Sequence, residues 1–337
     1  MSQNRTSHVW IDAPRIIAAL GVLWSLGWWS HTRGGVLVLA LMLAPSVIVP
    51  LGIALAASGD ARAPSLAYRG AVLLLPLDAL AAAYGWSRAP GHAIAIACAG
   101  IHLVVCALVA LHGLTRAIAR LRAGGLLGVV TPISELAIDV GLTLLPIGSV
   151  WLLASRAAQP LAGFHEPIVT LTAAHFHYAG FAAPLVLGCV GRAFGLAKEK
   201  TASAYGIGTI TVCAGIPLTA IGIMTTHTVE AVAAVTLACG MLVACALLAA
   251  VVPRRATEVS KAAALLFVLA GLALLGTMAL AATFALTSSA GRSSTFSGPL
   301  TVQTMIDFHG GGNALGFALG ALVALTIVDR QRRARLT

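Results

Sequence analysis

The chain has 337 residues, of which 59% are hydrophobic and only 9% are charged, and its mean hydropathy is +0.94. Soluble domains carry about 25% charged residues, so this composition excludes an ordinary soluble globular protein. It indicates an all-α, polytopic membrane protein. The formal net charge is +10, but no aromatic residues interleave with the basic ones in the tail DRQRRARLT, and we expect no nucleic-acid partner.

Long apolar runs set the expected number of membrane spans. A spanning helix needs about 20 mostly apolar residues, and too few residues remain in the loops for a separate soluble domain. We therefore expect a single integral membrane helical domain over residues 1–337. The predicted spans lie near residues 16–30, 36–57, 66–85, 92–114, 126–154, 168–190, 205–223, 228–251, 262–286 and 312–328.

The distribution of basic residues predicts the orientation. With ten spans and both termini in the cytoplasm, 17 of the 21 Lys and Arg residues fall on the cytoplasmic side. The opposite side receives only Arg33, Arg88, Arg156 and Arg292. Because cytoplasmic loops of membrane proteins are enriched in Lys and Arg, we expect a multi-pass protein of the cell membrane whose basic loops face anionic lipid.

No cofactor is predicted. The six cysteines fall within predicted helices and form no CxxC pair, so neither a disulfide framework nor a zinc site is indicated. His175 and His177 are two residues apart, which places them about 200° apart around a helix. They cannot readily chelate one metal ion, and a metal site would need ligands from other helices, such as His309 or Glu166.

Two carboxyl groups of the fifth predicted helix are candidate proton donors. Glu135 and Asp139 are four residues apart and therefore share one helix face. In apolar surroundings, repulsion and desolvation disfavour two charged carboxylates, and we expect at least one to be protonated. Such a group suits an acid catalyst, and it equally suits one step of a proton-coupled transporter.

Polar residues also gather near the predicted outer ends of the last five helices. They occur in the fragments FHEP (164–167), HFHYAGF (175–181), TTHTVE (225–230) and DFHGGGN (307–313). Glu166 is expected at a helix start, where the helix dipole favours a carboxylate, with Pro167 as the first helical residue. His102 receives no predicted role. Ionisable residues in spans are candidate functional groups by default, and these fragments therefore define the predicted site.

Two of these segments resemble the YndJ-like bacterial membrane proteins. The match is close over His175–Phe181, and a second segment matches at His309, Asn313 and Phe317, among others. Actinobacterial members of similar appearance are associated with membrane terpene cyclases that close a farnesyl chain on an indole or diketopiperazine. The resemblance therefore implies a protonation-initiated cyclase that acts on a lipophilic prenylated substrate within the lipid bilayer.

The chemistry implied by this resemblance assigns roles to the candidate residues. The acid is Asp139 or Glu135, with Glu166 or Asp307 as rivals, and a histidine orients the acid or takes the final proton. Aromatic rings hold cationic intermediates. The predicted catalytic residues are Asp139, Glu135, Glu166, His175, His177, Asp307 and His309, and the predicted substrate-binding residues are Phe176, Tyr178, Phe181, Phe308, Asn313 and His227.

Other functions fit the same residues. A proton-coupled transporter of a small molecule also uses many helices, helix-breaking prolines and intramembrane carboxylates. The sequence shows no clear inverted repeat, however, and its polar groups gather at one end of the predicted helices. A haem or metal redox protein would need opposed histidines on two helices. The cyclase is therefore the first predicted function, and the transporter is the alternative.

Overall fold

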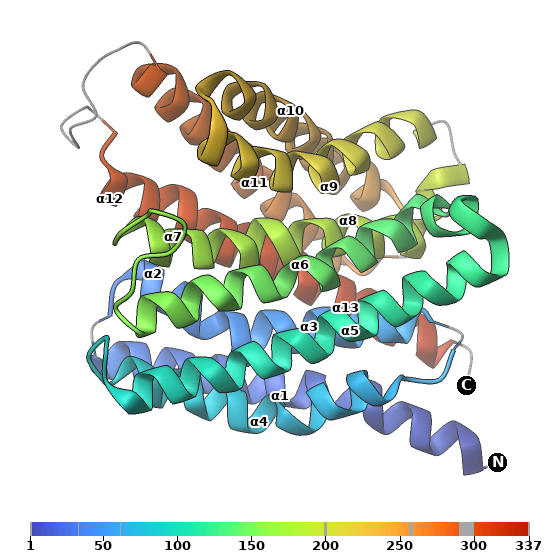
Figure 1. Ribbon diagram of the computed structural model, residues 1–337. Helices are drawn as coiled ribbons and strands as arrows, with labels where there is room; N and C mark the ends of the chain where they lie inside the picture. Colours follow the sequence, from blue (N-terminus) through green and yellow to red (C-terminus); the bar gives the residue numbers. More distant parts are fainter. Residues whose placement is uncertain are drawn as a thin grey trace. The chain divides into compact units, whose positions relative to one another are not determined.

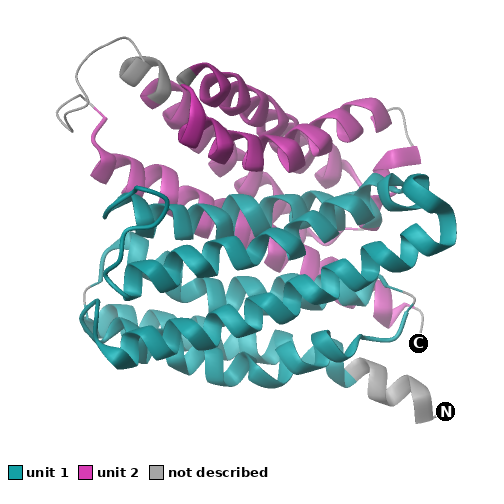
Figure 2. Ribbon diagram, viewed as in Figure 1, with its two compact units in different colours: residues 1–192 teal, residues 193–337 magenta. Residues whose placement is uncertain are grey.

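The computed structural model describes residues 2–32, 34–60, 62–198, 201–255, 259–289 and 300–335. The side chains of residues 2–8, 227 and 285–289 lie outside that description. The described residues form helices and their connections, which confirms the all-α prediction (Figure 1). The chain divides into two compact units, residues 1–192 and 193–337 (Figure 2). The prediction of a single domain stays a prediction.

Unit 1 consists of long helices joined by short connections. Its first elements are α1 (Ser2–Thr32), α2 (Val36–Leu43), η1 (Ala44–Ile48), α3 (Val49–Ser58), α4 (Leu66–Trp86) and α5 (Ala93–Val130). They are followed by α6 (Ile133–Arg156), α7 (Ile168–His175), η2 (Phe176–Ala182) and α8 (Ala183–Phe194), whose last two residues belong to unit 2.

Unit 2 is also helical throughout its described length. Its elements are η3 (Leu196–Lys198), α9 (Ala202–Thr225), α10 (His227–Ala246), η4 (Leu247–Val251), η5 (Val252–Arg254), α11 (Lys261–Ser289), α12 (Val302–Thr304), η6 (Met305–Gly310), η7 (Gly312–Leu319) and α13 (Gly320–Ala334).

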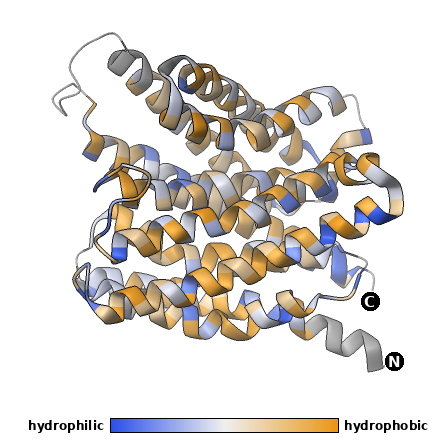
Figure 3. Cartoon of the chain, viewed as in Figure 1, coloured by the Kyte–Doolittle hydropathy of each residue, from blue (hydrophilic) through white to orange (hydrophobic). Residues whose placement is uncertain are grey.

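Ten helices of the described chain are long and apolar enough to cross a membrane, and Figure 3 shows the apolar colour along them. A bilayer offers no water to the backbone, so continuous helices satisfy its N–H and C=O groups internally. The protein is therefore polytopic, as predicted. The ten spans are Val9–Thr32, Val36–Ser58, Leu66–Trp86, Ala93–Val130, Ile133–Arg156, Ile168–Phe194, Ala202–Thr225, Thr228–Arg254, Lys261–Phe284 and Val302–Ala334.

Several predicted boundaries differ from the observed ones. The first span begins at Val9 rather than near residue 16, and the fourth ends at Val130 rather than near residue 114. The fifth span begins at Ile133 rather than near residue 126, because residues 126–130 continue α5 after a kink at Gly124 and Gly125. The last span begins at Val302 rather than near residue 312. Its glycine-rich segment, predicted at the start of the helix, therefore lies further inside it.

Wider π-helical turns interrupt two spans of unit 1. One turn, η1, contains Pro45, and the other, η2, contains His177. Turns of this kind occur mostly as short bulges and are frequent at functional sites. Helices α4, α5 and α6 lie side by side (Figure 1), and η2 packs on α6. This arrangement brings polar residues of α4, α5 and η2 together inside unit 1.

Candidate functional site

Three ionisable side chains meet in the interior of unit 1. Asp78 of α4 and His177 of η2 are completely buried, and His102 of α5 is 3% exposed. A charged or polar group is costly inside a membrane protein unless it has partners. Each of these three groups has one, since Asp78 contacts His102 and His102 contacts His177.

The hydrogen-bond partners fix the direction of this chain. His177 Nδ1 lies 2.7 Å from the Ala173 carbonyl oxygen, and it must donate because a carbonyl only accepts. The Nε2 atom of a neutral His177 is then an acceptor, so His102 Nε2, 2.8 Å away, donates to it. His102 Nδ1 lies 2.9 Å and 3.1 Å from the two Asp78 carboxyl oxygens. One proton therefore sits between that nitrogen and the carboxyl group.

The Asp78–His102–His177 hydrogen-bond chain lies near the middle of the helices that carry it. Asp78 is eight residues before the end of α4, and His102 is nine residues after the start of α5. At 1.5 Å per residue these offsets are about 12 Å and 14 Å, close to half of a hydrocarbon core about 30 Å thick. The prediction that His177 belongs to a polar belt at the outer helix ends is therefore wrong.

A cysteine completes the polar surroundings of the chain. Cys106 Sγ lies 3.4 Å from His102 Nε2, and Cys106, His102 and His177 each offer one possible metal-ligating atom, all within 4.8 Å of one another. Such atoms can ligate zinc or copper. The two Nε2 atoms are 2.8 Å apart, whereas two nitrogens on a tetrahedral zinc ion lie about 3.3 Å apart. The observed distance fits a hydrogen bond, and we describe the group as a hydrogen-bonded chain.

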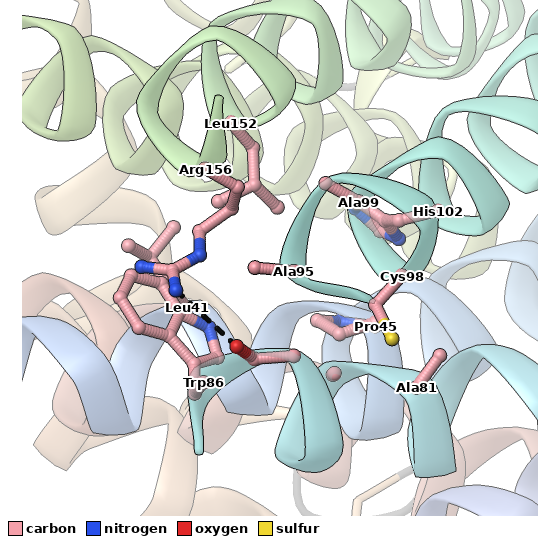
Figure 4. A pocket seen from close by; sticks show the side chains of 12 residues that line it. Leu41, Pro45, Ala81, Trp86, Ala95, Cys98, Ala99, His102, Leu152 and Arg156 are labelled. Atoms are coloured by element: carbon pink, nitrogen blue, oxygen red, sulfur yellow. Dashed lines mark hydrogen bonds between the residues drawn. The ribbon is translucent and has the colours of Figure 1, made fainter. Parts of the chain in front are cut away.

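Two cavities share part of their lining, and His102 borders the inner one. The inner cavity has a volume of about 20 Å³, enough for about one water molecule. Its lining includes Leu41, Leu152 and His102, and it shares Trp86 and Arg156 with an outer cavity of about 290 Å³. Figure 4 shows the Arg156 side chain against Trp86, with His102 on the α5 side of the inner cavity.

Ion pairs link α5, α6 and α8 at the opposite end of unit 1. Arg116 contacts Asp60, Glu135 and Asp139. Arg192 holds Glu135 through two bonds of 2.6 Å and 2.7 Å, and Arg120 contacts Asp139. The prediction that Glu135 and Asp139 lie in apolar surroundings is therefore wrong, because their carboxyl oxygens face guanidinium groups.

Asp60 joins this cluster from the connection between α3 and α4. Its carboxylate accepts hydrogen bonds from the backbone and side chain of Arg62 and from Arg116. Burial works to raise the pKa of Asp60, but the Arg62 hydrogen bonds and the Arg116 and Arg62 charges outweigh it. The pKa therefore lies below its ordinary value of 3.8.

The residues of the segment HFHYAGF (175–181) differ in their exposure and in their contacts. His175 is exposed and bonds through Nδ1 to the Leu171 carbonyl, so the two histidines face different neighbours, as the helix geometry predicts. Phe176, Tyr178 and Phe181 are buried, and the Tyr178 hydroxyl donates to the Ala40 carbonyl. None of these three aromatic residues lines either cavity.

Glu166 lies at the start of α7, as predicted. Its carboxylate accepts from the backbone N–H and the hydroxyl of Thr170, and it lines the outer cavity. Pro167 is the residue that precedes the first helical turn rather than its first member. Glu166 is thus both a helix cap and a cavity residue.

The remaining predicted site residues belong to unit 2. His309 donates through Nδ1 to the Thr277 carbonyl, and Asn313 accepts from the Thr277 hydroxyl. Asp307 accepts from Gln303, and the Phe308 side chain is 65% exposed. His227 begins α10, and its side chain lies outside the described residues. The prediction that His177 and His309 share one cavity stays a prediction.

Sequence reasoning missed the pairing of Asp78 with His102. Both residues stand in apolar runs, and the default expectation for intramembrane ionisable residues applies to them as it does to Glu135. Partner choice depends on which helices pack side by side, and hydropathy carries no such information. The presence of these ionisable groups was therefore visible in the sequence, but their contact was not.

Comparison with curated proteins and with solved structures gives no significant match. A protein-family comparison does give one, and it covers the helices that carry Asp78, His102 and His177. The model of the YndJ-like proteins matches residues 39–317. Since this range is most of the chain, the protein belongs to the YndJ-like family.

Proposed function

We propose that the protein is a proton-coupled transporter of a small solute in the cell membrane, and that Asp78, His102 and His177 carry the coupling proton. The observation that supports this proposal is their unbroken hydrogen-bond chain near the middle of three spans. Intramembrane carboxylate and histidine chains are typical of proton relays in pumps and transporters.

The surroundings of the chain support the same function. The outer cavity offers room for a small molecule, and the inner cavity borders His102. The ionisable groups near the chain are Cys106, which touches His102, and Cys98 and Arg156, which line the inner cavity. At the far end of unit 1, the ion pairs around Arg116 join the helices. In this proposal the solute enters through the outer cavity, and the ion pairs around Arg116 close the opposite end. Such an arrangement suits alternating access.

The test uses the full-length protein in vesicles with an entrapped pH-sensitive dye. We expect addition of a mixture of small polar metabolites to move protons with the wild-type protein. Asp78→Asn keeps a hydrogen-bond acceptor for His102 but has no carboxyl proton to exchange, so proton movement should fall to the level of protein-free vesicles. The matched control is Asp12→Asn, since the Asp12 side chain is 46% exposed on α1 and an asparagine oxygen can still accept the hydrogen bond from Arg15. Normal proton movement by folded Asp78→Asn would refute the relay.

Chelation supplies a second check on the relay. Because we assign His102 and His177 to a hydrogen bond rather than to a metal ion, treatment with EDTA should leave proton movement unchanged. Loss of proton movement on chelation and its return with added zinc or copper would instead assign these side chains to a metal.

A second candidate function is the protonation-initiated terpene cyclase. The observation that favours it is the apolar inner cavity, where His102, itself paired with Asp78, lies near Leu41, Leu152 and Trp86. In this reading the Asp78–His102 pair replaces Asp139 as the acid. A volume of about 20 Å³ must expand to hold a farnesyl chain, and the cyclase therefore stands second.

Incubation of membranes with a farnesylated indole tests the cyclase directly. The alkene gains one proton, the rings close, and a final proton is lost, so the product must have the mass of the substrate. In deuterated water the product should carry one deuterium at the protonated carbon. A product that has the mass of the substrate in ordinary water, carries this label in deuterated water and is absent in Asp78→Asn membranes would move the cyclase ahead of the transporter.

A further inference from the structure

The outer cavity of unit 1 carries two opposite charges that do not contact each other. Arg156, the last residue of α6, and Glu166, beside the start of α7, both line it. Among the described residues, no carboxylate oxygen lies within 4.0 Å of the Arg156 guanidinium. The cavity therefore presents a cation and an anion at separate places on its wall.

Arg156 is the buried member of this pair. It is only 5% exposed, and its guanidinium carbon lies 4.5 Å from the centre of the Trp86 ring. Nη2 donates to the carbonyl oxygens of Gly85 and Arg88, while Nε is buried and has no hydrogen-bond partner among the described residues. An unsatisfied buried donor on a charged group is costly, and an acceptor with negative charge is what this group lacks.

Glu166 is the exposed member, and its orientation is fixed from one side. The Thr170 hydroxyl donates to Oε1 at 2.8 Å, and the Thr170 backbone N–H donates to Oε2 at 3.2 Å. Because the Thr170 hydroxyl donates to Glu166, the Ser155 hydroxyl donates to Thr170 at 2.6 Å. A carboxylate has about four acceptor positions, so Glu166 keeps capacity for a cationic donor.

We propose that this cavity binds a small zwitterion of the amino-acid or dipeptide class. The carboxylate of the solute accepts hydrogen bonds from Arg156, and its ammonium group donates to Glu166. A volume of about 290 Å³ suits a solute of this size, and hydrogen bonds between a charged guanidinium and a carboxylate are among the strong ones. That this solute is transported rests on the proposed function, whereas its binding does not.

Thermal unfolding of the purified full-length protein provides the binding assay. Each protein amino acid and dialanine is added in turn, and at least one is expected to raise Tm in a concentration-dependent way. The best binder is then compared with its amide, which lacks the carboxylate, and with its deamino analogue, which lacks the ammonium. Each analogue should bind at least about tenfold more weakly, since each loses one charge-assisted contact. Absence of any rise in Tm across the panel would overturn the proposal.

Variants separate the two contacts. Glu166→Gln changes an exposed side chain, and it should weaken the amino acid about tenfold while the deamino analogue binds as well or better. Arg156→Gln should remove amino-acid binding, and Arg88→Gln is its control because that exposed side chain rests on Tyr84 outside the cavity. Unchanged amino-acid affinity in Glu166→Gln would overturn the zwitterion in favour of a simple anion.

The same measurements distinguish a failure of the proposed solute class from a failure of the proposed proton relay. Asp78→Asn should bind the amino acid normally, because Asp78 lies outside the outer cavity. Proton movement without amino-acid binding would overturn only the solute class. Amino-acid binding together with normal proton movement in Asp78→Asn would overturn only the relay.

Discussion

The position of the His177 ring depends on a residue that has no side chain. Gly148 of α6 faces that ring, and a Cβ atom placed there would lie 2.8 Å from His177 Nδ1 and 3.0 Å from Cε1. Both distances are shorter than ordinary van der Waals contact, so the imidazole would have to move. Because its Nε2 accepts from His102, such a movement breaks the hydrogen-bond chain.

Gly148→Ala therefore should impair proton movement in the vesicle assay without removing any ionisable group. We expect a loss of about 10²-fold or more, the lower end of the effect of a general acid or base. Gly100→Ala on α5 is the control, because no described atom other than those of the neighbouring turns of α5 lies within 4 Å of the added Cβ atom. Wild-type proton movement in Gly148→Ala would mean that the ring has room to adjust.

Asp60 allows a pH test outside the spans. Its pKa is depressed in the folded protein, so the folded state favours the carboxylate, and this contribution to stability is present above pH 3.8. It is lost as the pH falls through the lower pKa of the folded state. Asp60→Asn should therefore lower Tm near neutral pH, by the equivalent of roughly 1–3 kcal/mol. The difference from wild type should shrink as the pH approaches that folded-state pKa, and an equal difference at all pH values would contradict this assignment.

At the scale of elements, ion pairs join helices whose neighbours hydropathy alone does not predict. Glu135 and Asp139 both belong to α6, and their partners Arg116 and Arg192 lie on α5 and α8. Removing one member of a buried ion pair leaves the other charge without compensation. We therefore expect these ion pairs to stabilise the packing of the three helices rather than to transfer protons.

Asp139→Asn tests this interpretation of the cluster. The change leaves Arg116 and Arg120 facing a neutral amide, and we expect a loss of about 3–5 kcal/mol in unfolding free energy. Unfolding of the purified protein in detergent measures it, with Asp307→Asn as the control because, within the described part of the chain, that side chain accepts an exposed hydrogen bond from Gln303 and forms no ion pair. Wild-type stability together with abolished function would return Asp139 to the role of an acid.

Hydropathy predicted the elements well because each span satisfies its own backbone. The boundaries at residues 126–133 and 302–312 were harder to predict. Glycines can either end a helix or kink it, and polar residues can lie inside a span when they have partners. Asp139 was placed in apolar surroundings because its partner Arg116 is 23 residues away in sequence. Contacts of this kind depend on tertiary packing.

At the scale of the molecule, unit 1 has two different ends. Arg62, Arg116 and Arg192 gather near one end with their acidic partners. At the other end, Arg156 donates to the Arg88 carbonyl beside the outer cavity. In the expected orientation the first group faces the cytoplasm and the second faces outward, and that orientation stays a prediction. The Asp78–His102–His177 chain lies between the two ends.

Reporter fusions test the orientation along the whole chain. With ten spans and both termini in the cytoplasm, fusions at Gly59 and Lys198 should report inside, and fusions at Gly91 and Ser294 should report outside. Gly59 and Gly91 bracket the α4 span, so a reversed signal at either one would contradict the assignment of that helix. Ser294 lies outside the described residues, between the last two spans. An inside signal there would contradict the expected orientation of the last two spans. The last span, which contains His309, would then cross the membrane from the inside to the outside.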